Sequence, residues 1–100
     1  MIYIDQHDEI LDKKLEIFEK WFQNCCYLEE NSIIKLTGKD SLYDHYCEFS
    51  IKQHQEPYSL RKFMNSLRED YALQYRQKLN TKRKMDGFWL YGLAIRSHCN

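Results

Sequence analysis

The side chains of this sequence with the clearest chemistry are the cations and the amide of the segment 59–70, "SLRKFMNSLRED". At helical spacing its apolar residues fall on one side, and the polar residues that face away from them are Arg61, Lys62, Asn65 and Arg68. Guanidinium and ammonium groups bind phosphate oxygens, and a carboxamide can pair with the edge of a base. The segment therefore has the side chains that a helix needs to read the major groove of DNA.

A second basic group lies further along the chain, in "NTKRKMDG" at 80–87. Because Asn, Asp and Gly are typical turn residues, the sequence predicts a long hairpin loop here, and its cations are Lys82, Arg83 and Lys84. A basic loop beside a recognition helix can follow the neighbouring backbone or the minor groove. With two further cations just before the loop, the predicted nucleic-acid-binding residues are Arg61, Lys62, Asn65, Arg68, Arg76, Lys78, Lys82, Arg83 and Lys84.

The zero net charge of the 100 residues conceals an uneven distribution. Residues 1–50 hold five Lys and Arg against eleven Asp and Glu, whereas residues 51–100 hold ten against four. Such an imbalance can turn one face of a protein toward a polyanion. About six phosphate contacts would give a slope of about −5 for the logarithm of the affinity against the logarithm of the salt concentration on duplex DNA.

The sequence does not predict an enzyme, a cofactor or a metal site. Asp44, His45 and Glu48 would share one helix, but no nucleophile, glycine-rich phosphate loop or set of metal ligands accompanies them. The four cysteines form no CxxC pair. We expect reduced thiols, with Cys25 and Cys47 as small core residues.

A membrane-spanning or secreted protein is also not expected. No apolar run approaches the roughly 20 residues of a membrane helix. The acidic N-terminus, "MIYIDQHDEI", lacks the basic flank and apolar core of a signal peptide. The expected location is intracellular, in the cytoplasm or, for a viral protein, also the nucleus of the host cell.

Three helices that would position these groups follow from the apolar periodicity. An acidic leading helix over 8–28 has an apolar stripe at steps of three and four residues, which Trp21 widens: Leu11, Leu15, Phe18, Phe22 and Cys25. "SIIKLTG" follows as a short strand, and a second helix over about 40–54 begins at Asp40 or Ser41. Pro57 interrupts the pattern, and Ser59 caps a third helix over about 60–69.

Two strands are predicted near the C-terminus. Residues 71–76 alternate between apolar and polar character, and "FWLYGLAI" is rich in strand-forming residues. The aromatic rings of this region could stack on unpaired bases, although a domain of this size needs some of them inside, and we expect Phe88 in the core. The residues concerned are Tyr75, Phe88, Trp89 and Tyr91.

The expected order is therefore helix, strand, helix, helix, strand, loop, strand in one domain over residues 1–100. This is the order of a winged helix-turn-helix, an α+β fold with three helices and a small antiparallel sheet whose hairpin is the wing. The leading helix would occupy 8–28 and the winged-helix core 32–96.

The stretch "WFQNCCYLEENSIIKLTGKDSLYDHYCEFSIKQHQEPYSLRKFMNSLRED", leading into "GFWLYGLAI", resembles the C-terminal winged-helix region of virus- and phage-type, poxvirus-like primase-helicases. The matching features are the "CC" helix end, "LYDHYCEF", the "EPYSLRKF" turn and helix, and the final aromatic strand with its glycine; together they span about residues 17–96. The resemblance implies a DNA-binding accessory module of a replicative helicase, contacting duplex or forked DNA. The chain contains no GxxxxGK[ST] loop, so the ATPase chemistry of such proteins is not expected in these residues.

Two other functions fit the same sequence. One is a protein–protein interaction module, in which the acidic 8–28 helix and Trp21 contact another domain or a second copy. The other is a stand-alone transcriptional regulator that binds a palindrome as a dimer, with the same helix at the dimer interface.

Overall fold

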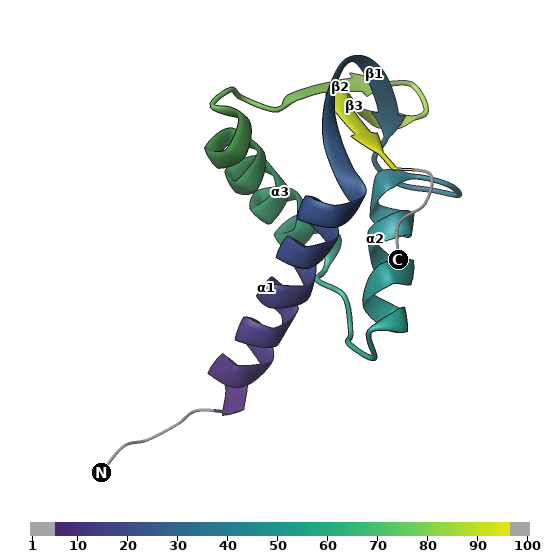
Figure 1. Ribbon diagram of the computed structural model, residues 1–100. Coiled ribbons are helices and arrows are strands. Elements are labelled where there is room, and N and C mark those ends of the chain that lie inside the picture. The colour runs from purple at the N-terminus through teal and green to yellow at the C-terminus, as the bar shows by residue number, and fades with distance from the viewer. Residues whose placement is uncertain (1–5, 97–100) are drawn as a thin grey trace.

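The computed structural model describes the backbone of residues 6–96 and the side chains from residue 13 onward. In this part of the chain the elements follow in the order α1 (Gln6–Cys25), β1 (Cys26–Lys35), α2 (Leu42–Lys52), α3 (Leu60–Tyr75), β2 (Asn80–Lys84) and β3 (Gly87–Ile95). The three strands form one antiparallel sheet at one end of the helices (Figure 1). The predicted α+β class is confirmed.

Helix α1 leads directly into the sheet. Its buried side chains recur on one side, and they include most of the predicted stripe: Ile17, Phe18, Trp21, Phe22 and Cys25. Leu15, which was predicted on this stripe, is 40% exposed, and the side chain of Leu11 lies outside the described ones. The helix ends at Cys25 rather than at residue 28, because the residues that follow pair with β3. Cys26 lies opposite Ile95 and Leu28 opposite Leu93, so β1 begins well before the predicted residue 32.

The core consists largely of aromatic rings from all three helices. Phe18, Trp21, Tyr46 and Phe63 are fully buried. The ring centroids of Phe18 and Tyr46 are 5.7 Å apart, and those of Tyr46 and Phe63 are 4.8 Å apart. Such ring pairs add about 0.5–1.5 kcal/mol beyond the burial of their surface. Because Trp21 lies inside this cluster, the expectation that it contacts a partner protein is wrong.

Helix α3 is longer than its predicted range of 60–69, and residues 71–75 are helical rather than extended. The alternation of Tyr71, Leu73 and Tyr75 indicated a strand, but Leu73 faces solvent and is 79% exposed. The two tyrosines are four residues apart, on one side of a helix, with ring centroids 4.9 Å apart. Burial of Tyr71 thus favours one more turn of helix, which ends where Arg76 adopts a left-handed φ of 55°.

Strand β2 occupies most of the segment that was predicted to be a loop. Its residues pair with β3, so that Lys82 lies opposite Trp89 and Arg83 opposite Phe88, and only residues 85 and 86 remain for the turn. The long basic loop over 80–87 is therefore wrong. Cationic side chains have low strand propensity, but the hydrogen bonds and ring contacts that β3 offers outweigh it.

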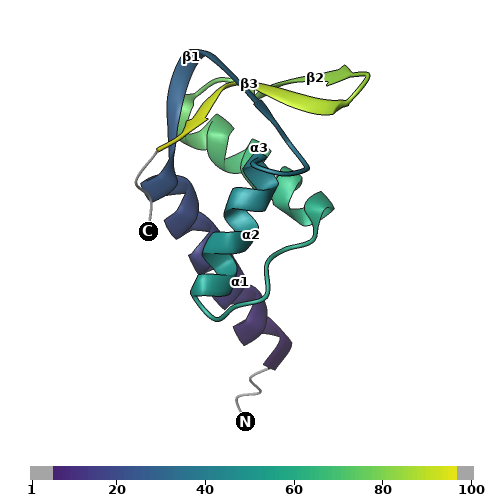
Figure 2. The same ribbon diagram turned by 90° about the vertical axis from the view of Figure 1, so that its right-hand side faces the viewer.

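The sheet order is β1-β3-β2, which leaves β2 at one edge (Figure 2). Figure 2 shows the β2–β3 hairpin on the same side of the molecule as α3, and side chains of both elements line one groove. The N-terminal half of α1 projects away from the sheet. The hairpin and α3 are therefore the elements that could form one surface.

The oxidation state of the cysteines differs in part from the prediction of reduced thiols. Cys25 is buried, as predicted, but it is disulfide-bonded. Cys26 and Cys47 are free, and Cys47 is partly buried against the core. The expectation of reduced thiols is thus wrong for Cys25, because it relied on the lack of a targeting signal, which says nothing about which cysteines meet in the fold. Over residues 6–96, no helix has both the length and the apolar character needed to cross a membrane.

Candidate nucleic-acid interface

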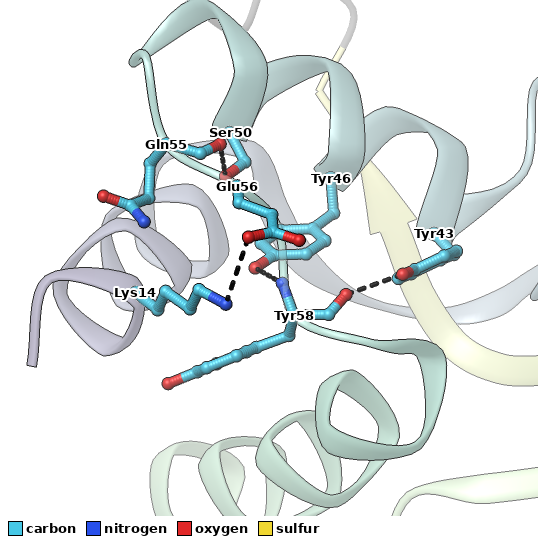
Figure 3. A network of polar contacts seen from close by, with 7 residues as sticks. All are labelled: Lys14, Tyr43, Tyr46, Ser50, Gln55, Glu56 and Tyr58. Atoms are coloured by element: carbon cyan, nitrogen blue, oxygen red, sulfur yellow. Dashed lines mark hydrogen bonds and ion pairs between the residues drawn. The ribbon is translucent and has the colours of Figure 1, made fainter. Parts of the chain in front are cut away.

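The turn that joins α2 to α3 fixes the start of α3. Two tyrosines of α2 hold the backbone of Tyr58 from both sides (Figure 3). Tyr46 Oη accepts a hydrogen bond from the Tyr58 N–H at 2.9 Å, and Tyr43 Oη donates one to the Tyr58 carbonyl at 2.6 Å. Both polar backbone groups of one turn residue are thereby fixed to α2.

The two ends of this turn are also held. Ser50 Oγ donates to the Gln55 carbonyl at 2.8 Å, and Lys14 Nζ of α1 lies 4.0 Å from a carboxylate oxygen of Glu56 (Figure 3). Ser59 caps α3 as predicted, since its Oγ accepts from the Lys62 N–H at 3.4 Å. The first turn of α3 therefore has a defined position relative to α1 and α2.

One stripe of α3 carries three of the predicted residues. Arg61, Asn65 and Arg68 are spaced by four and three residues, which places them on one side of the helix, and all three are exposed. The ion pairs found among the described residues, Lys14–Glu56 and Lys35–Asp86, involve neither arginine. The stripe thus presents two guanidinium groups and one carboxamide to solvent.

Lys62 does not belong to this stripe. Its Nζ lies 5.8 Å from the centre of the Tyr58 ring, and it lines a separate hollow with Lys14 and Glu56. The structure therefore separates Lys62 from Arg61, the residue before it in sequence, and from Arg68.

The three consecutive cations of β2 alternate between the two faces of the hairpin. Arg83 is opposite Phe88, with its guanidinium 5.9 Å from the centre of that ring. Lys82 is opposite Trp89 on the other face, where Lys84 Nζ lies 5.1 Å from the Trp89 ring. Neighbouring side chains of a strand point to opposite faces, so the three cations cannot all face one ligand. Arg83 lies on one face of the hairpin, and Lys82 and Lys84 lie on the other.

The face with the two lysines also carries a carboxylate. Trp89 Nε1 donates to Asp86 Oδ1 at 3.0 Å, and Lys35 Nζ lies 3.8 Å from Asp86 Oδ2. The hydrogen bond from Trp89, with smaller contributions from the nearby lysines, lowers the pKa of Asp86. This face is therefore less positive than a count of its lysines implies.

The other face of the hairpin meets α3 in an apolar groove of about 250 Å³. Arg61 and Arg68 from the stripe lie along it, and Phe88, 47% exposed, borders it from β3. The expectation that Phe88 belongs to the core is wrong, because its side chain lies on the face of the hairpin that borders the groove and not in the buried cluster. The residues that line the groove are Leu36, Leu60, Arg61, Met64, Arg68, Thr81, Phe88 and Leu90.

The remaining predicted cations lie beyond the groove. Arg76 ends α3 in its left-handed conformation, and Lys78 lies in the segment between α3 and β2; both are exposed. Neither lines the groove. They extend the positive surface along the chain without sharing a site with Arg61.

Sequence reasoning missed two apolar residues at this surface. Leu60 was assigned to the buried side of α3 but is 37% exposed and lines the groove. Met85, at the tip of the hairpin, is fully exposed. Once the turn was known to contain two residues, the position of Met85 at the tip would have followed from the sequence.

No protein family, no curated protein and no solved structure matches this chain in the comparisons with known proteins.

Proposed function

We propose that this chain is a DNA-binding winged-helix module, the accessory domain of a viral or mobile-element replicative primase-helicase. The observation that carries the proposal is the exposed stripe of Arg61, Asn65 and Arg68 on α3, directly beside a hairpin with three further cations. Helix α3 would enter the major groove and the hairpin would contact the adjacent backbone. The module would act without chemistry of its own.

The order of elements supports this assignment. A helix, a strand, two helices and a hairpin follow one another, and the sheet order β1-β3-β2 places the hairpin next to α3. The tyrosine-held turn between α2 and α3 would present the reading helix in one fixed orientation. The resemblance of residues 17–96 to primase-helicase C-terminal regions supports the replicative role.

The test is the affinity for duplex DNA over a salt series. We expect the double variant Arg61→Ala/Arg68→Ala to lose about tenfold or more in affinity and to lower the salt slope by about 2, because each lost phosphate contact removes about 0.9 from it. Lys62→Ala is the matched control, since it removes a cation of the same helix turn that lies outside the stripe. Unchanged affinity in the double variant, or no binding of the wild type at low salt, would refute the proposal.

A second candidate function, protein binding, is favoured by a different surface. Leu73 is 79% exposed and lines a hollow between α1 and α3 together with Glu19 and Asp70. An exposed leucine beside carboxylates suits a basic protein partner better than DNA. A partner that binds wild type but not Leu73→Ala, with DNA affinity unchanged, would assign this function.

A further inference from the structure

The groove between α3 and the hairpin separates the two kinds of cation on this surface. Arg61 and Arg68 line it, and Arg83 lies on the same face of the hairpin, against Phe88. The exposed lysines of α3 and β2 do not line it. The segregation matters because a guanidinium group is planar, binds phosphate through two parallel hydrogen bonds and stacks on flat rings, whereas an ammonium group does not.

The lining of the groove suits a flat apolar ring next to an anion. Leu36, Met64 and Leu90 form its inner wall, and Phe88 offers part of its ring. Thr81 supplies a hydroxyl group that can donate or accept a hydrogen bond. The residues that line the groove include no carboxylate.

From these features we infer that the groove holds one unpaired base of a DNA strand, with the adjoining phosphates on Arg61 and Arg68. The inference rests on the proposed function and specifies it: the module would prefer forked or single-stranded DNA to a fully paired duplex. In a duplex the bases are stacked and paired, so they cannot enter a side groove. A base at a fork has no such restraint.

The dimensions of the groove favour a base over a peptide. Its volume of about 250 Å³ lies below the range of about 300–1,000 Å³ that is typical of sites for larger ligands. A helical peptide would need a longer apolar channel for side chains on successive turns. A single ring with a charged backbone on one side matches both the volume and the arginines.

The experiment compares a blunt duplex with a fork that has the same paired segment and two unpaired arms. We expect the wild type to bind the fork about tenfold more tightly, since stacking of one base on a protein ring is typically worth at least a fivefold gain. Phe88→Ala and Leu60→Gln should abolish this preference while leaving the affinity for the blunt duplex nearly unchanged. Both side chains are partly exposed, so the variants should fold, which circular dichroism would verify.

One control variant and two further measurements isolate the groove. Leu73→Ala removes an exposed leucine elsewhere on α3 and should leave the preference for the fork intact. Arg68→Lys keeps the charge but removes the planar group, so the preference should fall while the salt slope remains. A 2-aminopurine base in the unpaired arm should change fluorescence on binding to wild type, but not to Phe88→Ala.

The outcomes separate this inference from the proposed function. Equal affinity for fork and blunt duplex, with a normal salt slope, would overturn the base site and leave the DNA-binding proposal standing. No binding to either DNA at low salt would overturn both. Binding of an acidic, leucine-containing peptide that depends on Phe88, without a preference for the fork, would assign the groove to a protein and also overturn the inference.

Discussion

At the scale of single residues, the fold controls the charge state of His45. Trp21 Nε1 donates a hydrogen bond to His45 Nδ1 at 3.0 Å, which requires an unprotonated Nδ1. Burial lowers the pKa of His45 from its ordinary value of 6.5, and Glu48 and Asp44 only partly counteract this effect. The neutral imidazole is thus part of the packed interface between α1 and α2.

This state of His45 predicts how stability depends on pH. Because the folded-state pKa is lower than the unfolded one, the unfolded chain takes up a proton first as the pH falls, and the free energy of unfolding drops below about pH 6.5. Urea titrations at pH 7.5 and 5.5 should show a smaller loss for His45→Gln than for the wild type. His54→Gln, at an exposed position, is the control and should retain the wild-type loss. Equal losses in all three proteins would contradict the assignment.

Gly92 is the second residue with a specific requirement. Its φ is +88°, and a Cβ built there would lie 2.9 Å from Tyr71 Oη, which itself donates to the Gly92 carbonyl at 3.4 Å. We expect Gly92→Ala to reduce the free energy of unfolding by about 2–4 kcal/mol, from backbone strain together with the clash. Gly38→Ala is a matched control, because Gly38 also has a positive φ of +106° but no atom within 4 Å of the added Cβ. If thermal melts show the same loss for both variants, the contact with Tyr71 has no energetic role.

At the scale of elements, two tyrosine hydroxyl groups of α2 hold the turn that leads into α3. The hydroxyl of Tyr46 is buried, and burial raises its pKa to about 12, so it stays protonated over the physiological range. Tyr46→Phe removes the acceptor of the Tyr58 N–H in a buried setting and should cost about 1–3 kcal/mol in unfolding. Tyr43→Phe should cost less, because Tyr43 itself is only partly buried. Chemical denaturation measures both, and the reverse order would contradict this account of the turn.

The elements also show what could be predicted from the sequence. The stripe of α1, the cap at Ser59 and the strand over 87–95 were predictable because each depends on local spacing or one local hydrogen bond. The end of α1 and the strand β2 were not, because both depend on pairing with β3, far away in sequence. The same contrast between local spacing and long-range pairing applies to the candidate site. The stripe on α3 could be predicted from the spacing of its residues, but the separation of Arg83 from its two neighbours depends on the register of the hairpin.

At the scale of the whole molecule, acidic residues lie on an element that extends away from the proposed DNA-binding surface. The molecule measures 52 × 28 × 27 Å, and α1 extends away from the sheet (Figure 1), whereas α3 and the hairpin together carry six of the 15 Lys and Arg residues. Glu16 and Glu19 lie exposed on the middle of α1. If the chain binds DNA as proposed, these carboxylates would act on it through the long-range field rather than through contact.

This separation predicts a salt-dependent effect of residues that do not touch DNA. Because the Debye length is about 8 Å at physiological salt and about 30 Å at 0.01 M, Glu16→Gln/Glu19→Gln should change the DNA affinity less than about twofold at physiological salt and raise it several-fold at 0.01 M. Fluorescence anisotropy over a salt series measures the difference in DNA affinity between this variant and the wild type. Arg61→Ala/Arg68→Ala should instead weaken binding at every salt concentration, because contacts are lost. The difference in affinity between the glutamine variant and the wild type should shrink as the salt concentration rises. If it stayed constant, α1 itself would contact the DNA, contrary to the arrangement proposed for α3 and the hairpin.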